Sequence, residues 1–280
     1  MKKTAILIVL YDKEICDSTT VESLTKLELK GTRLIIHNNG PYEINLTKEQ
    51  SHIFKKKGVD DVILVNSIEN KPLSIIYNDF INANLDCEIF SIFDDDSEIS
   101  MNYISILKND SFEIELPKIL SRVDSKVYYP TVDRNVFSED GNIITGDIFS
   151  IGSGLTITRT VIDKFNKHKI KLFDEHYALY GVDFSFFRRL KILQKKGEAF
   201  RVSSNFTLLH SLSKAEVIQS EFRHNERLID FSLTVRHYPT VHLYLSFIKR
   251  MTLDFVKLNV KDASLVLSTY FNGSHPRCRK

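Results

Sequence analysis

The stretch "FSIFDDDSEIS", residues 90–100, places three adjacent carboxylates at the end of an apolar run. This run begins as "EIFSIF", residues 88–93, which has little polar alternation and is typical of a strand covered on both faces. Two negative charges about 4 Å apart repel by roughly 4 kcal/mol near a protein surface. The segment therefore predicts a buried strand whose acidic end needs either solvent or a bound cation.

Three earlier runs have the same character. They are "AILIVLY" (5–11), "RLIIHN" (33–38) and "DVILVN" (61–66). Thr19 and Glu22 at capping-box spacing, with Gly31 as terminator, indicate a helix between the first two runs, and residues 71–85 form a second helical pattern. Strands joined by crossover helices predict an open, mostly parallel, Rossmann-like sheet. In such a sheet ligands bind outside the carboxyl ends of the strands, where the aspartates lie.

The second half of the chain is mixed and then helical. Residues 101–108 predict a helix, followed by short strands such as "FEIEL" and "KVYY" and by the glycine-bearing segment "IGSGLTITR". The segment "VDFSFFRRLKILQKKG" predicts a helix that starts near Val182 and stops at Gly197. After Ser211 the sequence is helical, basic and aromatic. Because no repeat or Pro/Gly linker interrupts the chain, we expect its parts to share one core.

Composition excludes several classes of protein. The chain has 280 residues, 42% of them hydrophobic, which suits one large globular unit. A formal charge of +2 argues against nucleic acid as a partner bound by bulk electrostatics. Cys16, Cys87 and Cys278 lack the spacing of a zinc site or disulfide framework and fit a reducing cytoplasm. The opening "MKKTAILIVLYDKE" lacks a small-residue cleavage site, and no apolar stretch reaches the ~20 residues that span a bilayer.

Asp94, Asp95 and Asp96 have the chemistry of a cation site. Their hard oxygen ligands suit Mg²⁺ or Mn²⁺, and Mg²⁺ usually takes one or two protein carboxylates while sharing its remaining positions with substrate phosphates. A divalent cation would relieve the repulsion and favour a diphosphate ligand. The alternative is a solvated acidic turn in which Asp96 caps the following helix. The triplet alone leaves both interpretations open.

Several short motifs follow one another in a characteristic order. They are "AILIVLYDKE", "LIIHNNG", "NKPLSIIYN", "FDDDS", "GSGLTITR", "LYGVDFSFFRRL" and "LLHSLS". Each is weak alone, but their ordered spacing over residues 5–213 resembles the family 2 glycosyltransferases with the GT-A fold. The resemblance is greatest to the rhamnosyltransferase-like members that build bacterial surface polysaccharides.

The resemblance implies an α/β fold of GT-A type, a Rossmann-like, mostly parallel sheet flanked by helices, with a C-terminal helical extension. It implies a nucleotide-sugar-binding half in residues 1–100. Residues 101–215 would form the acceptor-binding and catalytic half of the same domain. Residues 216–280 would form the basic, aromatic helical extension.

By the same resemblance, Asp183 is the catalytic base and a Mn²⁺ or Mg²⁺ ion is bound by Asp94, Asp96 and His210. The implied nucleotide-sugar-binding residues are Leu10, Tyr11, Asn38, Asn70, Asn78, Asp94 and Asp95. Two departures from the family pattern matter. Asn38 stands where the family usually has an aspartate that recognises the nucleotide base, and Val182 replaces the first carboxylate of a Glu-Asp pair.

The implied reaction is an inverting, metal-dependent transfer of a sugar from a UDP- or dTDP-sugar. The acceptor would be a glycan or a polyprenyl-diphosphate-linked glycan in O-antigen, capsule or other surface-polysaccharide synthesis. The implied location is the cytoplasm. The resemblance leaves open whether the protein attaches peripherally to the inner face of the bacterial cytoplasmic membrane, and whether it forms an oligomer. The C-terminal segment could rest on that membrane, or form a lid or a dimer surface.

Each candidate residue also has an ordinary structural role open to it. Asp183 could simply place a negative charge at a helix N-terminus. His210 could be a hydrogen-bonded core residue, Asn70 could cap a helix, and Tyr11 could be an aromatic residue at a strand end. The two arginines of "FFRRL" could orient a loop, meet a phosphate or lie on a helix surface.

Two other functions compete with sugar transfer. A Mg²⁺-dependent phosphatase or nucleotidyltransferase also places aspartates after a Rossmann-like strand, but it leaves "GVDFSFFRRL" and "LLHSLS" unexplained. A catalytically silent module that binds nucleotide sugars is the third interpretation.

Overall fold

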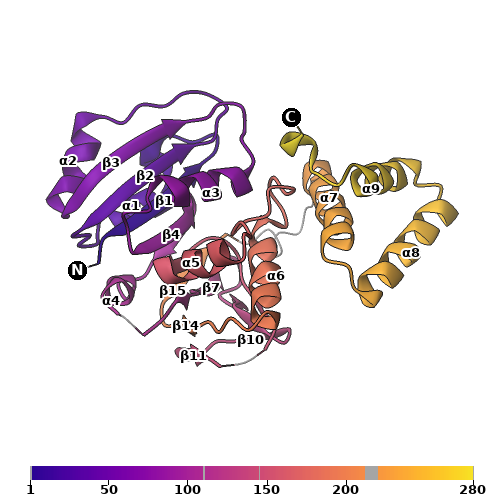
Figure 1. The fold of residues 1–280 in the computed structure, drawn as a ribbon. Helices are drawn as coiled ribbons and strands as arrows, with labels where there is room; N and C mark the ends of the chain where they lie inside the picture. Colours follow the sequence, from indigo (N-terminus) through magenta and orange to yellow (C-terminus); the bar gives the residue numbers. More distant parts are fainter. Residues whose placement is uncertain (1, 110, 145, 212–219, 280) are drawn as a thin grey trace.

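The computed structural model describes residues 2–109, 111–144, 146–211 and 220–279. An eight-stranded sheet runs through the main body, and three C-terminal helices stand to one side of it (Figure 1). Its strands, in spatial order, are β11 (Gly141–Ile143), β14 (Val202–Ser204), β6 (Ile114–Glu115), β13 (Thr156–Thr158), β4 (Ile89–Asp94), β1 (Thr4–Leu10), β2 (Thr32–Asn38) and β3 (Val59–Asn66). Strands β4, β1, β2 and β3 are mutually parallel, as the apolar runs predict.

The edge strand β3 is less covered than its apolar sequence suggests. Only Val59 of its eight residues is buried, so the expectation of a strand covered on both faces is wrong here. The helix α2 (Lys48–Lys56), which the apolar pattern does not reveal, packs over one face through Phe54. Ile63 and Val65 remain exposed on the strand. The missed signal for α2 is the capping box that Thr47 forms with Gln50.

The N-cap of the first crossover helix is one residue earlier than the sequence predicts. Ser18 caps α1 (Thr19–Leu24), because its Oγ accepts a hydrogen bond from Val21 N at 3.2 Å. The expected Thr19 box is therefore wrong. Gly31, at φ 72°, leads into β2 rather than ending the helix directly.

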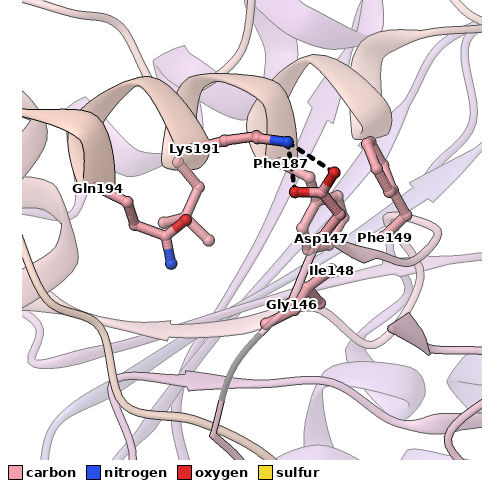
Figure 2. Close-up of a pocket in the computed structure, with 8 residues that line it drawn as sticks. Gly146, Asp147, Ile148, Phe149, Phe187, Lys191 and Gln194 are labelled. Carbon is pink, nitrogen blue, oxygen red and sulfur yellow. Dashed lines mark hydrogen bonds and ion pairs between the residues drawn. The ribbon is translucent and has the colours of Figure 1, made fainter. Parts of the chain in front are cut away.

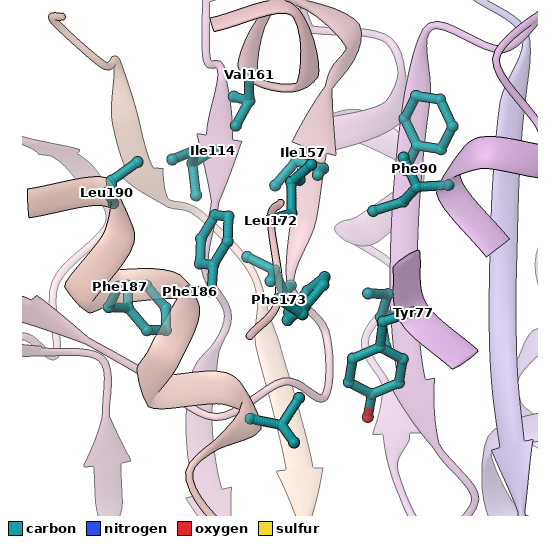
Figure 3. Packing of buried hydrophobic residues seen from close by; sticks show 14 of the residues in the cluster. Tyr77, Phe90, Ile114, Ile157, Val161, Leu172, Phe173, Phe186, Phe187 and Leu190 are labelled. Atoms are coloured by element: carbon teal, nitrogen blue, oxygen red, sulfur yellow. The ribbon is translucent and has the colours of Figure 1, made fainter. Parts of the chain in front are cut away.

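Two apolar layers cover the main sheet. Alternate residues of β1 point to opposite layers, so Leu7 packs in one cluster and Ile8 in the other. The first cluster includes residues of α3 (Leu73–Ala83), α5 (Arg159–Lys167) and α6 (Val182–Lys195) (Figure 3). In it, the ring of Phe186 stacks on Phe165 with centroids 5.8 Å apart and on Phe173 with centroids 5.6 Å apart. This packing fixes where α6 begins.

Two small sheets complete the second half. One contains β5 (Glu98–Ile99), β15 (Thr207–His210), β7 (Lys118–Ser121) and β8 (Val127–Tyr129), and the other contains β10 (Asn135–Val136), β9 (Thr131–Val132) and β12 (Ile148–Phe149). Strand β15 pairs antiparallel with β5, directly after the aspartates, and parallel with β7. This pairing carries the end of β15 toward the end of β4. The short helix α4 (Tyr103–Leu107) follows β5.

The C-terminal helices are α7 (Glu221–His237), α8 (Val241–Val256) and α9 (Val260–Asn272), as the helical pattern predicts. A 3₁₀ turn, Pro276–Cys278, then returns to the main body, where Arg277 Nη1 donates to Asn70 Oδ1 at 2.8 Å. His275 N donates to the backbone oxygen of His176 at 2.8 Å. Among the described residues, no helix combines the length and apolar character needed to cross a bilayer.

Candidate functional site

The end of β4 and the end of β15 meet in an Asp-Asp-His cluster. One possible ligand atom from each of Asp94, Asp96 and His210 lies within 4.8 Å of the others. His210 Nδ1 is 3.0 Å from Asp96 Oδ1, and His210 Nε2 is 3.8 Å from Asp94 Oδ2. The predicted metal residues are therefore brought together by the pairing of β15 with β5, across more than a hundred residues of sequence.

The loop that carries the aspartates is held in place by hydroxyl groups. Thr20 Oγ1 donates to the backbone oxygen of Asp94 at 2.5 Å and accepts from Ser97 N at 2.8 Å. Ser153 Oγ accepts from Asp94 N at 3.0 Å. The next helix, α4, begins only at Tyr103, so the interpretation of Asp96 as a helix cap is wrong.

Burial and mutual repulsion set the charges of this cluster. Burial raises the pKa of Asp94 to about 7, with Asp96, Asp183 and Asp95 adding to the rise and His210 opposing it. Burial also acts to raise the pKa of Asp96, but the hydrogen bond and charge of His210, the charge of Lys13 and a hydrogen bond from Ser211 together outweigh it, and this pKa is lowered. The pKa of His210 is raised, because its acidic neighbours outweigh its burial. Either a proton on Asp94 or a bound cation would relieve this repulsion.

The donor set fits a hard divalent cation. It combines two carboxylates with one imidazole, a set compatible with Mg²⁺ or Mn²⁺. Asp96 Oδ1 is buried, and its polar neighbour is His210 Nδ1 at 3.0 Å. Asp95 points elsewhere and pairs with Lys13, whose Nζ lies 2.8 Å from its Oδ1. The triplet therefore divides into two candidate ligands and one residue engaged in an ion pair.

Asp183 lies in the first turn of α6, after Gly181 in a left-handed conformation at φ 82°. Burial raises its pKa to about 6, while a hydrogen bond from the backbone N–H of Gly152 and the charge of His210 oppose the rise. A Cβ atom at Gly152 would stand only 2.4 Å from Asp183 Oδ1. Position 152 therefore has room for the carboxylate only because it is glycine.

A cavity of about 420 Å³ joins these groups. Asp94, His210 and Asp183 line it together, with Tyr77 and Tyr180 among its aromatic walls. Helix α7 contributes Phe222, Arg223 and Asp230. Burial raises the pKa of Asp230, whose Oδ1 accepts from Thr234 Oγ1 at 3.2 Å. Sequence reasoning missed Asp230, because it lies within a helix without any local motif around it.

A second hollow lies between α6 and β12 and is too small for a substrate. Its volume is about 10 Å³, the space of about one water molecule (Figure 2). Lys191 closes it by pairing with both carboxylate oxygens of Asp147. This hollow is a packing feature of α6.

The other predicted nucleotide-sugar residues lie outside the walls of the 420 Å³ cavity. Leu10 is buried at the end of β1, and Tyr11 beside it is 50% exposed. Asn38 Nδ2 donates to Asn66 Oδ1 at 2.7 Å and to the backbone oxygen of Tyr42 at 2.6 Å. The amide of Asn38 thus has partners within the protein, and its nucleotide role stays a prediction.

Asn70 and Asn78 have structural partners. Asn70 Oδ1 accepts hydrogen bonds from Arg277 and, at 3.3 Å, from Asn39. The cap of α3 is Pro72, so the alternative of Asn70 as helix cap is wrong. Asn78 Nδ2 donates to the backbone oxygen of Phe173 at 2.9 Å, and its Oδ1 accepts from Phe173 N at 3.1 Å. Binding roles for both asparagines stay predictions.

The two arginines of α6 differ. Arg189 Nη2 lies 2.9 Å from Oδ1 of the buried Asp174, and its Nε donates to Tyr238 Oη at 3.0 Å. The Arg188 guanidinium lies 5.5 Å from the ring centroid of Tyr238. Arg189 therefore joins α6 to α7 and to the loop before α6, which is a structural role.

No known family profile and no curated protein matches the sequence. Solved structures do match the fold. S. aureus TarS 1–349 in complex with UDP-GlcNAc aligns over 99% of this chain and 82% of that one, with 11% identity and a TM-score of 0.56. The chain has a GT-A-type fold. The predicted fold class is thereby confirmed.

Two further TarS structures agree with this assignment. TarS 1–349 in complex with UDP matches with 10% identity and a TM-score of 0.52, covering 83% of this chain and 72% of that one. The longer TarS chain matches with 10% identity and a TM-score of 0.52, covering 84% of this chain. This chain spans only 44% of that longer protein. Identities this low establish the fold alone.

Proposed function

We propose that this protein is a glycosyltransferase that moves a sugar from a nucleotide-diphosphate donor to an acceptor hydroxyl. One observation carries the proposal: Asp94 and His210 of the candidate metal cluster line the same cavity as the half-buried carboxylate of Asp183. The cavity opens at the carboxyl end of β4, a strand parallel to β1, and ligands bind at such strand ends in open α/β sheets.

Asp94, Asp96 and His210 would hold Mn²⁺ or Mg²⁺. The ion would neutralise charge that develops on the departing nucleotide diphosphate. The donor side of the proposal gains support from the solved TarS structures, which contain UDP and UDP-GlcNAc. A UDP- or dTDP-sugar is therefore the proposed donor, with Leu10, Tyr11, Asn38, Asn70, Asn78 and Asp95 as the further proposed contacts.

Asp183 is the proposed base. With a pKa of about 6 it is mostly ionised at neutral pH, yet basic enough to accept the proton of an acceptor hydroxyl. The Gly152 N–H holds the carboxylate in one orientation. A base that faces the acceptor, opposite the leaving diphosphate, produces inversion at the anomeric carbon. Inversion is therefore part of the proposal.

The wider role is proposed from the motif resemblance. It comprises membership of family 2, a rhamnosyltransferase-like specificity and a part in O-antigen, capsule or other bacterial surface-polysaccharide synthesis. The acceptor would be a glycan or a polyprenyl-diphosphate-linked glycan. The domain division at residues 100 and 215 is proposed on the same basis.

A donor screen tests the proposal. Purified protein is incubated with Mn²⁺ and a panel of UDP- and dTDP-sugars, and released nucleotide is measured together with donor affinity. We expect at least one donor to yield nucleoside diphosphate by slow hydrolysis, in which water replaces the acceptor hydroxyl and takes the sugar, and Asp183→Asn to bind that donor while losing turnover. Asp163→Asn, which changes an exposed carboxylate of α5, is the matched control and should be unaffected.

The products separate the competing functions. Release of inorganic phosphate would indicate a phosphatase, and pyrophosphate would indicate a nucleotidyltransferase. Donor binding without turnover, unchanged by Asp183→Asn, would support a silent binding module. Normal turnover by Asp183→Asn would remove this residue as the base.

A further inference from the structure

Helix α8 presents an apolar face to solvent. Val241, Leu245, Ile248 and Phe255 follow one another at intervals of four, three and seven residues, so they share one side of the helix. Their side chains are between 60% and 82% exposed. The face continues through Val256 and into the turn before α9. We define the α8 surface as Val241, Leu245, Ile248, Phe255, Val256 and Leu258.

The opposite side of α8 is anchored within the helical unit. The ring of Phe247 packs against Tyr270 of α9, with centroids 5.1 Å apart, and against Phe231 of α7, with centroids 6.2 Å apart. Arg250 Nε donates to Asp254 at 2.6 Å, and its Nη2 donates to Asp262 of α9 at 2.6 Å. These contacts fix the rotation of α8, which lies on the side of the helical unit away from the main body (Figure 1).

The exposed charges around this surface are basic. Residues 239–279 contain two acidic residues, Asp254 and Asp262, and both are buried in the ion pairs with Arg250. Lys249 is exposed and directly follows Ile248. It comes four residues after Leu245 and seven before Val256, so it lies beside both of them on the helix surface. Lys257, at the end of α8, is also exposed. The apolar face is therefore bordered by positive charge within residues 239–279, and the exposed Glu221 of α7, which reaches this segment, is paired with Lys261.

We infer that the α8 surface docks the protein on an anionic phospholipid membrane. A helix with one apolar face and basic flanks lies in the interface plane, with its apolar side chains among the acyl chains and its lysines at the lipid phosphates. The alternative occupant is a second copy of this chain. Pairing of two such surfaces would bring Lys249 of both copies together, with no exposed acidic residue of residues 239–279 opposite it. Charge complementarity therefore favours the membrane.

This docking has a consequence for the candidate site, and that consequence rests on the proposed function. Helix α7 packs against both α8 and α9, and it also lines the 420 Å³ cavity through Phe222 and Asp230. A membrane-bound helical unit would therefore hold one wall of the cavity close to the lipid surface. A lipid-linked acceptor could then reach Asp183 without leaving the bilayer.

Vesicle sedimentation tests the inference. The full chain is mixed with vesicles of phosphatidylcholine alone, or of phosphatidylcholine and phosphatidylglycerol in equal parts. We expect binding to the anionic vesicles, weaker binding to neutral ones, and a loss of binding when the NaCl concentration is raised to about 0.5 M. Lys249→Glu/Lys257→Glu should weaken binding by about fivefold or more for each lysine removed. Leu245→Glu/Ile248→Glu should weaken it at least tenfold.

Matched variants separate docking from misfolding and from catalysis. Val123→Glu changes a similarly exposed apolar residue outside the helical unit, and Lys55→Glu/Lys56→Glu reverses two exposed charges on α2. Both should bind vesicles as the wild type does. Asp183→Asn should also bind normally, so a failure of the proposed reaction would leave this inference standing.

Two results would overturn the inference. One is equal sedimentation of the wild type and the α8 variants with anionic vesicles. The other is a dimer in analytical ultracentrifugation that Leu245→Glu/Ile248→Glu dissociates, without any vesicle binding by the wild type. The second result would assign the α8 surface to self-association.

Discussion

Replacing Gly152 with alanine should displace the proposed base without unfolding the protein. The new Cβ would stand 2.4 Å from Asp183 Oδ1 and 3.0 Å from its Cγ. Since an ordinary contact of this kind is about 3.4 Å or longer, the carboxylate must move by about 1 Å. The backbone at position 152 lies outside the left-handed region, so alanine itself fits there without conformational strain.

A displacement of about 1 Å at a reacting group can cost roughly a hundredfold in rate. This corresponds to about 2.7 kcal/mol in the activation free energy. The fold should lose little, because the clash is with the end of a side chain, and a glycine-to-alanine change can stabilise a compatible site by about 0.4–1 kcal/mol. We therefore expect turnover to fall about a hundredfold while the donor affinity and melting temperature stay close to wild type.

The assay measures nucleotide release at saturating donor, together with donor affinity by calorimetry. Gly197→Ala is the control, because its Cβ would meet no atom within 4 Å and only backbone strain at φ 93° would be felt. The double variant Gly152→Ala/Asp183→Asn should be no slower than Asp183→Asn alone, because both changes act through one carboxylate. Full turnover by Gly152→Ala, or equal additional losses in the double variant, would refute this reasoning.

Three further predictions follow from the charges of the site and its supports. Since burial raises the pKa of Asp183 to about 6 and a base must be ionised, turnover should rise about tenfold between pH 5 and pH 7; a flat pH-rate profile over this range would contradict the assignment. Chelation of divalent cations, or Asp96→Asn, should weaken the binding of UDP or dTDP at least about tenfold in calorimetry, whereas Asp79→Asn on α3, an exposed ion-pair residue, should not; unchanged nucleotide affinity in chelator would exclude the metal role. Arg189→Leu should lower the free energy of unfolding by about 3 kcal/mol in urea denaturation, because it leaves the buried Asp174 carboxylate without its guanidinium; Lys191→Leu, which breaks an exposed pair on the same helix, should cost about 1 kcal/mol or less.

Local patterns predicted the elements that carry the site. The apolar runs around Leu7 and Phe90 indicated parallel strands, because strands covered on both faces have little polar alternation. The helix from Val182 to near Gly197 was also predicted well, since its apolar spacing and its glycine stop are local signals. The same signals failed at Thr19, where the neighbouring serine has the better geometry for the cap.

Other features depended on contacts between distant segments. The role of Asn78 as a link to Phe173 joins residues about a hundred positions apart, and no local pattern contains that information. The same holds for Asp230, which reaches the cavity because α7 and the start of α6 line it together. The exposure of Ile63 was missed because an edge strand and a central strand can have the same apolar sequence.

Strand periodicity and charge repulsion act between near neighbours, so the local sequence predicts a parallel sheet that ends in a cluster of carboxylates. It does not predict which of these carboxylates meets His210 and which pairs with Lys13. That choice follows from the register of β15 against β5 and β7, which depends on the packing of the whole second half of the chain. The close approach of Gly152 to the Asp183 carboxylate also depends on the tertiary structure, because it joins a loop and the start of α6 from different parts of the sequence.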